Sequence, residues 1–171
     1  MAPDQVSFKW LIEIGIALSS EKDSDRLMEI ISLEAKDMGN ADGGTLYIRT
    51  DDDKLQFVIL KTDSLGISQG GTTGTEITLP PVPMYDDNGR PNLNAIVSYA
   101  AISGETINVD DAYIAKDFDF SSTKKIDAAT GYRSQSFLTV SLKNNAGRVV
   151  GVLQLLNSLD KDSGEVVPFS R

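Results

Sequence analysis

Cysteine and histidine are both absent from the 171-residue chain. Without cysteine there is no disulfide, no zinc–thiolate site and no thiol nucleophile. Without histidine, histidine-ligated haem and a Ser-His-Asp hydrolase site are excluded, because both need an imidazole. The two absences argue against an enzyme, and the lack of cysteine favours an intracellular location.

Basic stripes and long apolar runs are absent too. The net charge is −9 and the sequence pI is about 4.4, and no run of lysine or arginine is present to bind nucleic acid. An acidic surface disfavours anionic membranes, and the longest apolar runs fall far short of the roughly 18–20 residues of a membrane span. Because the first residues lack the basic region and cleavage site of a signal peptide, we expect a cytoplasmic protein with no nucleic-acid or membrane partner.

Two amphipathic helices are expected at the start of the chain. Apolar residues recur at helical spacing over residues 6–18 and 24–38. In the second helix they are Leu27, Ile30, Ile31, Ala35 and Met38. We therefore separate an N-terminal linker or dimerisation helix, residues 1–22, from a domain over residues 23–171 whose length suits one hydrophobic core.

The middle of the chain combines strands with irregular segments. Residues 45–49 and 55–60 are rich in strand-forming residues and flank a short acidic turn, which predicts a hairpin. A short strand is expected over Glu76–Leu79. The prolines that follow it exclude a helix there, and the glycine-rich residues 66–74 are typical of a flexible loop or a hairpin.

The second half predicts further elements in turn. A helix is expected over residues 95–102, a strand over 106–109, and a loop over 110–133 with a helical turn near 122–127. Strands follow over 137–143 and 149–157. The run from Val149 to Leu156 is almost wholly apolar, which is typical of an interior strand covered on both faces. We expect a central antiparallel sheet of about five or six strands.

Five short motifs follow one another between residues 103 and 157. They are Ser103-Gly104-Glu105-Thr106, then Asn108 to Tyr113, Asp117-Phe118 with Phe120, Thr130 to Ser134, and Gly151 to Asn157. In this order and at this spacing they resemble the core of a GAF domain, the small-molecule-sensing module of signalling proteins. The resemblance covers about residues 24–169.

The resemblance implies an α/β (α+β) fold. In this family a twisted antiparallel sheet has the terminal helices on one face, and short helices and loops roof a ligand pocket on the other. The family's cyclic-nucleotide site, carried to matching positions, consists of Thr45, Ile96, Val97, Asp127, Thr130, Ser134 and Gln154. The implied ligand is a cyclic nucleotide or another small polar molecule, since the usual haem and bilin ligands are missing.

Several of these positions also have an architectural explanation. Gln154 lies inside Val-Leu-Gln-Leu-Leu, and a buried amide there either faces the pocket or has a structural partner, because an unpaired amide costs roughly 1–3 kcal/mol. The segment from Thr130 can shape the backbone through a positive φ at Gly131. Asp127 can be a helix cap or a turn residue. Arg133 can clamp an anion or, in better agreement with the charge balance, pair with an acidic side chain.

The end of the chain departs from the family pattern. Asn157 and Phe169 match the family's signature, but Ser158 stands where the family has lysine, which puts the family's lysine–aspartate salt bridge in question. Ser170 is typical of an N-cap with no helix after it. We therefore expect a piece of a longer protein that lacks its C-terminal helix, with a short native C-terminus as the alternative.

The function implied by the resemblance is regulatory. Residues 62–94 resemble the N-terminal GAF modules that precede HD-type phosphodiesterase or nucleotide cyclase domains. We expect a multidomain bacterial signalling protein in which a small-molecule ligand controls a covalently linked output domain. The alternative is a ligand-free GAF module that dimerises and relays a signal. Methionine-sulfoxide reductases of this family need cysteine, so an enzyme of that kind is not expected.

The N-terminal helix predicts a homodimer. Two amphipathic helices offer more apolar surface than one small sheet face can cover, and an exposed apolar stripe marks an interface. The stripe consists of Trp10, Leu11, Ile14 and Leu18. We expect a dimer in sedimentation at about 100 µM, a concentration at which micromolar contacts are populated. A monomer at that concentration, in a longer protein that retains the C-terminal helix, would contradict this prediction.

Overall fold

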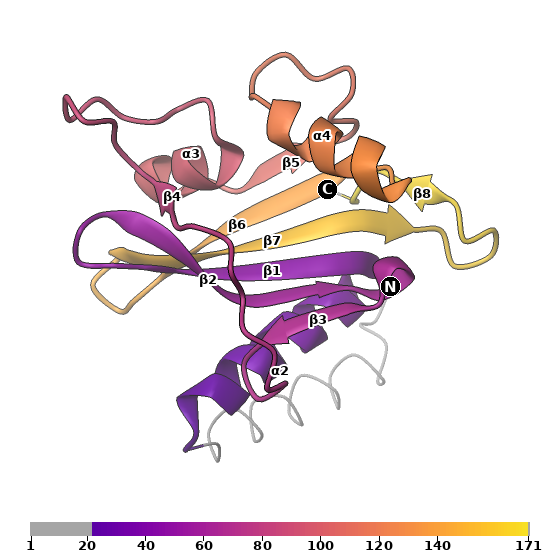
Figure 1. Ribbon diagram of the computed structural model, residues 1–171, viewed down its shortest axis with the longest axis horizontal. Coiled ribbons are helices and arrows are strands. Elements are labelled where there is room, and N and C mark those ends of the chain that lie inside the picture. Colours follow the sequence, from indigo (N-terminus) through magenta and orange to yellow (C-terminus); the bar gives the residue numbers. More distant parts are fainter. Residues whose placement is uncertain (1–21, 171) are drawn as a thin grey trace, which may run out of the picture.

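The computed structural model describes residues 22–170, which form one antiparallel sheet with helices on both faces (Figure 1). The helix expected over residues 6–18, and the dimer contact assigned to it, lie outside the described residues. Among those described, no helix is long and apolar enough to cross a bilayer. The elements are α2 (Ser24–Met38), β1 (Ala41–Arg49), β2 (Lys54–Thr62), η1 (Asp63–Leu65), β3 (Ile67–Gly70), β4 (Val82–Pro83), α3 (Ile96–Ser103), β5 (Ile107–Val109), α4 (Ser121–Thr130), β6 (Phe137–Lys143), β7 (Val149–Leu159) and β8 (Val166–Val167).

The sheet has the order β3-β2-β1-β7-β6-β5, and the two-residue strands β4 and β8 pair with β2 and β7. Strand β7 therefore lies between β1 and β6, and the prediction of an interior strand is confirmed. The hairpin of β1 and β2 is also confirmed. Both pairings are antiparallel, so the fold class predicted from the sequence is correct.

Helix α2 covers one face of the sheet and begins and ends where its sequence pattern predicted. The face it turns to the sheet overlaps only in part with the predicted apolar stripe, of which Ala35 packs against the cluster on this side. Ser32 and Lys36 are its buried residues, whereas Met38 is 66% exposed. The glycine opposite them explains the difference: a Cβ at Gly44 would lie 3.8 Å from the Cβ of Lys36, so the helix backbone approaches the sheet closely at this point.

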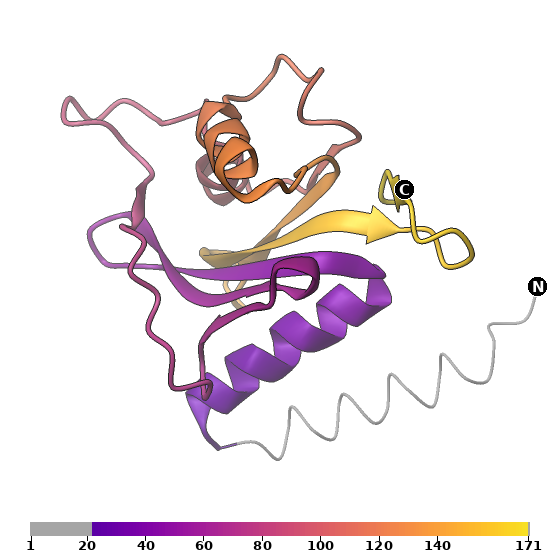
Figure 2. The ribbon, with the colours of Figure 1, turned by 45° about the vertical axis from the view of Figure 1, so that its right-hand side comes forward.

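Helices α3 and α4 and the loops around them cover the opposite face and form what we call the roof (Figures 1 and 2). A large apolar cluster lies between the roof and the sheet, and Leu55, Met84 and Val152 are fully buried in it. A second cluster, which includes Leu46, lies between the sheet and α2. The sheet is thus covered on both faces, as a near-continuous apolar run in β7 requires.

The segment between β3 and β4 corrects the sequence prediction. No strand forms over Glu76–Leu79, and the segment runs along the edge of the sheet from the α2 side to the roof side (Figure 2). Pro80 and Pro81 have no N–H for a ladder, which limits pairing here. Instead, Val82–Pro83 pairs with the start of β2, and the glycine-rich stretch supplies β3, which pairs with the end of β2. Helix α4 is also longer than the predicted turn.

Asn157 ties the roof to the central strand. It has a left-handed backbone, with a φ of 53°. Its Oδ1 accepts hydrogen bonds from the N–H groups of Gln135 (2.7 Å) and Ser136 (3.1 Å). Its Nδ2 donates to the carbonyl of Arg133 (2.8 Å) and to the hydroxyl oxygen of Tyr132 (2.9 Å). One buried amide therefore fixes the segment that leads from α4 into β6.

We predict that Leu55→Ala destabilises the fold by about 2–5 kcal/mol, because it leaves a cavity in the fully buried cluster under the roof. Leu93→Ala is the matched control, since Leu93 is 46% exposed and the same change there should cost less than about 0.5 kcal/mol. Urea unfolding of the two variants measures both values. Equal losses would contradict the assignment of the core.

We also predict that Asn157→Ala destabilises the fold by about 2–4 kcal/mol, because it removes the acceptor of two backbone N–H groups. Asn145→Ala, in the exposed β6–β7 turn, is the control and should be nearly neutral. Hydrogen exchange provides a local measurement: the amides of Gln135 and Ser136 should lose protection first. Unchanged protection of these two amides would show that Asn157 does not hold the segment.

Candidate functional site

A row of polar side chains crosses the centre of the sheet on the roof face. Thr45 of β1 and Thr139 of β6 are the register partners of Gln154 on either side of β7. The Nε2 of Gln154 donates to Thr139 Oγ1 at 3.1 Å. Val152 and Leu156, which point to the same face as Gln154, both pack in the cluster beneath the roof. The row is therefore a polar strip in an apolar floor.

Thr45 and Gln154 keep part of their surface accessible, although both lie on central strands. Thr139 is fully buried and was not among the predicted site residues. Strand register could have revealed it, because it lies directly opposite Gln154. Gln154 thus has a structural partner and also keeps an accessible surface. The two explanations left open by the sequence, a structural partner and a position facing the pocket, are therefore compatible.

Helix α3 places Ile96 and Val97 against the sheet. Their exposed fractions are 8% and 6%, and they pack with Val152 in the apolar cluster. The N-cap residue, Ala95, offers no side-chain acceptor to the first turn. The first N–H groups of a helix have no acceptor within the helix itself. This end of the roof therefore consists of an apolar wall and backbone donors.

Asp127 and Ser134 contact each other directly. Asp127 is buried on the inner side of α4. Its Oδ1 accepts from Ser134 Oγ (2.8 Å), and its Oδ2 accepts from Ser134 N (2.8 Å) and from the hydroxyl of Tyr113 (2.6 Å). The pKa of Tyr113 is raised above its ordinary value, mainly because its hydroxyl donates this hydrogen bond to the carboxylate of Asp127. Three donors compensate the buried charge, so Asp127 organises the roof loop.

Thr130 is not brought together with the other predicted residues. It is exposed at the end of α4, and its hydroxyl donates to the carbonyl of Ile126 at 2.9 Å. This bond to the preceding turn is a common use of threonine in helices. Gly131 follows with a φ of 73°, as its position in the motif predicted. The motif ends a helix here, and its threonine hydroxyl is used locally.

Tyr132 and Asp42 form a second anchor of the roof, which the sequence analysis did not single out. The hydroxyl of Tyr132 donates to Asp42 Oδ2 at 2.5 Å. Asp42 Oδ1 accepts from both the N–H and the hydroxyl of Ser64, at 3.1 and 2.6 Å. Burial, followed by the bond to Asp42, raises the pKa of Tyr132. Because Asp42 and Tyr132 are far apart in the chain, no local pattern indicated the contact.

The predicted ion pair of Arg133 with an acidic side chain does not form within residues 22–170, and Arg133 lies over an aromatic ring instead. Its guanidinium lies 3.9 Å from the centre of the Tyr113 ring, and Lys124 Nζ lies 5.3 Å from the same centre. Among the described residues Arg133 has no acidic partner within salt-bridge distance. An aromatic face attracts a cation through the quadrupole of the ring, and this contact takes the place of the expected carboxylate.

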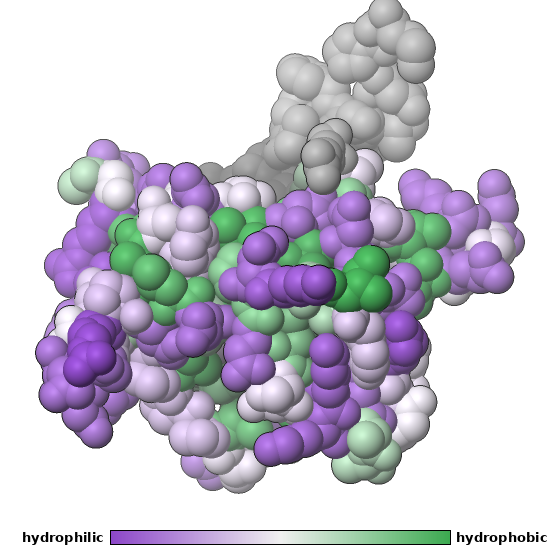
Figure 3. Space-filling model, turned by 90° about the horizontal axis from the view of Figure 1, so that it is seen from above, coloured by the Kyte–Doolittle hydropathy of each residue, from purple (hydrophilic) through white to green (hydrophobic). Residues whose placement is uncertain are grey.

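Seen from above, most of the surface is hydrophilic, with apolar residues between polar ones (Figure 3).

Comparison with known proteins gives a consistent result. The profile of the GAF domain family matches residues 23–171. The dual 3',5'-cyclic-AMP and -GMP phosphodiesterase 11A of Takifugu rubripes is 41% identical over 71 residues, which cover 42% of this chain and 7% of the relative. The chain therefore spans only a small part of this relative's length.

Solved structures show the same fold. The GAF domain of an Acinetobacter phosphoenolpyruvate-protein phosphotransferase is similar with a TM-score of 0.65 and 15% identity, over 100% of this chain and 84% of that one. The free methionine-R-sulfoxide reductase of Neisseria meningitidis is similar with a TM-score of 0.58 and 18% identity, over 99% and 81%. At such identities the likeness concerns the fold alone. From the profile match, which spans most of its length, the chain belongs to the GAF domain family, a family of small-molecule-sensing regulatory modules.

Proposed function

We propose that this GAF domain binds a purine cyclic nucleotide under its roof and thereby regulates an output domain of the phosphodiesterase or nucleotide cyclase type in the same protein. The observation that carries the proposal is the polar row of Thr45, Gln154 and Thr139 on the roof face of the sheet. The similarity of part of the chain to a phosphodiesterase named for both cyclic nucleotides supports the choice of ligand. A bacterial source stays a prediction.

The proposed ligand lies over the polar row, with its planar base against Gln154. The amide has both donor and acceptor atoms, and among the described residues its only hydrogen bond is the one to Thr139. Ile96 and Val97 form the apolar wall, and the first turn of α3 offers backbone N–H groups to the phosphate. These assignments give the ligand an apolar contact and a few oriented polar groups, as is usual for small-molecule sites.

Asp127 and Ser134 act in this proposal as positioning residues. Each is engaged with the other, and Asp127 also holds Tyr113. A ligand that prefers the closed roof favours the state in which these bonds are made. Because a ligand shifts an equilibrium only by its affinity difference between two states, the proposal requires a second state with a looser roof and a lower affinity for the ligand. Thr130, exposed and bonded to its own helix, has no part in binding.

A ligand-free relay module is the second candidate. The packing of Ile96, Val97 and Val152 in one buried cluster favours it, because the α3 half of the roof is closed onto the sheet. In that case the roof only stiffens the domain, and signals pass between partner helices without a small molecule. The two candidates differ in whether Gln154 meets a ligand, which binding measurements decide.

We predict that calorimetry detects binding of cAMP, cGMP or both. Gln154→Leu should weaken this binding by about 1–3 kcal/mol, or roughly 5- to 150-fold, because it leaves a polar edge of the ligand unpaired. The matched control is Gln56→Leu, on the exposed side of β2, which should bind as the wild type does. No heat with either nucleotide rejects the proposal and favours the relay. Equal affinity of the Gln154 variant and the wild type rejects the role of Gln154 alone.

A further inference from the structure

A small cavity lies on the other side of the sheet, between α2 and the strands β2 and β3. Its volume is about 20 Å³. Its lining includes Ser32, Leu33, Lys36, Gly44, Ile59 and Lys61. A space of this size holds one water molecule or one monatomic ion. It is separated from the roof by the whole sheet, so it is independent of the proposed nucleotide site.

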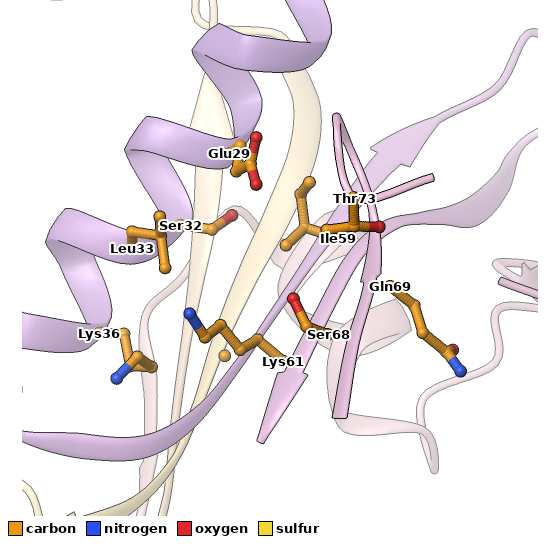
Figure 4. A pocket seen from close by; sticks show the side chains of 10 residues that line it. Glu29, Ser32, Leu33, Lys36, Ile59, Lys61, Ser68, Gln69 and Thr73 are labelled. Atoms are coloured by element: carbon orange, nitrogen blue, oxygen red, sulfur yellow. The ribbon is translucent and has the colours of Figure 1, made fainter. Parts of the chain in front are cut away.

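Ser32 provides an unpaired hydroxyl in this cavity. The residue is only 4% exposed, and its Oγ has no hydrogen-bond partner in the described part of the chain, residues 22–170. The hydroxyl points from the helix toward the strands (Figure 4). Buried hydroxyls are nearly always bonded, because removing them from water without a partner is unfavourable. The unpaired oxygen therefore indicates a guest that fills the cavity.

Lys61 provides an uncompensated charge at the same place. It stands on β2 opposite Gly44, and its amino group points toward α2 (Figure 4). No described residue forms an ion pair or side-chain hydrogen bond with it. The nearby ammonium of Lys36 is different, because it is bonded to Asp63 at 2.6 Å. Burial lowers the pKa of Lys36, but the hydrogen bonds and opposite charges of Asp63 and Asp37 together outweigh this effect, so the pKa is raised.

The remaining charged group of the cavity, Glu29, is already engaged. Its carboxylate accepts a hydrogen bond from the hydroxyl of Thr72. The hydroxyl of Ser32 can donate or accept a hydrogen bond, whereas the ammonium of Lys61 can only donate. A water molecule could bond to both groups, but it would leave the positive charge of Lys61 without an opposite charge. An anion has only acceptor sites and also compensates the charge of Lys61.

We propose that this cavity binds a small monovalent anion of the size of chloride, held between the hydroxyl of Ser32 and the ammonium of Lys61. A volume of about 20 Å³ suits a single monatomic ion better than a phosphate or carboxylate group. The glycine opposite Lys61 is part of the site, because it leaves the space that a side chain would fill. The anion joins α2 to β2, so its binding stabilises the packing of the helix on the sheet.

Thermal unfolding at constant ionic strength tests the proposal. Replacing sodium gluconate by sodium chloride or bromide, from about 10 to 300 mM, should raise the Tm of the whole chain by roughly 2–4 °C, because only the folded state has the site. Ser32→Ala and Lys61→Met should remove this increase. Neither change breaks a hydrogen bond or ion pair of the described residues, so both variants should fold.

Two matched variants separate the site from general charge effects. Lys54→Met removes the same charge from an exposed position of the same strand, where Lys54 pairs with Asp52, and it should keep the full halide response. Gly44→Ala adds a methyl group whose nearest neighbours lie 3.6 Å away or more, so it should fold and lose the response by filling the cavity.

Crystals grown in bromide give a direct answer. An anomalous peak between Ser32 and Lys61, absent in the Lys61→Met variant, supports the proposal. A water molecule at that place, or no peak, overturns it. An equal halide response in the wild type, Ser32→Ala and Lys61→Met overturns it as well, because the ion then acts elsewhere. An equal response to acetate and chloride rejects the limit on ion size, and with it the proposed site.

Discussion

The central strand β7 imposes the constraint on which the rest of the domain depends. Its backbone is paired along both edges, and its two faces are covered by the roof and by α2. Most side chains of the strand must therefore suit one of two buried layers. Apolar residues meet this demand at most positions. The three polar exceptions are Gln154, Asn157 and Ser158, which are bonded to the neighbouring strand, to the roof segment and to Gly39 after α2, respectively.

Buried carboxylates hold the roof, which explains how a largely irregular layer has a defined structure. Asp127 and Asp42 each accept hydrogen bonds from several donors in segments that lie elsewhere in the chain. A buried charge is costly unless it is fully hydrogen-bonded, so these carboxylates tolerate little displacement of their donors. In the proposed function, these bonds define the roof state that the ligand favours.

The two faces of the sheet differ in the kind of ligand that we propose for them. On the roof face, side chains of three strands place polar groups in one row, and a planar ligand with several polar atoms can use them. On the other face, α2 lies close to the sheet at Gly44, and a cavity of about 20 Å³ is left between them. The cavity on the α2 face has room for a single ion, whereas the polar row on the roof face is where we propose that a nucleotide binds.

Sequence patterns predicted most of the regular elements, because periodicity is a local property. The bounds of α2 and β6 agree with the prediction, and the apolar run of β7 indicated its central position. The short strands β3 and β4 were not predicted as strands. Their pairing depends on the edge that β2 offers and not on their own composition. The expected strand at Glu76–Leu79 failed for the same reason.

Some features of the candidate site could likewise be predicted from the sequence, and others depended on the tertiary structure. The sequence by itself determined the family, the polar exception at Gln154 and the absence of cysteine and histidine chemistry, since these are properties of residue identity and order. Only the tertiary structure decided which residues contact each other: Thr139 bonds to Gln154, Ser134 bonds to Asp127, and Tyr113 packs against Arg133. It also decided that Ser32 is buried without a hydrogen-bond partner among the described residues. These contacts depend on strand register and on how the helices pack against the sheet. Both join residues that are far apart in the sequence, so no local sequence pattern encodes them.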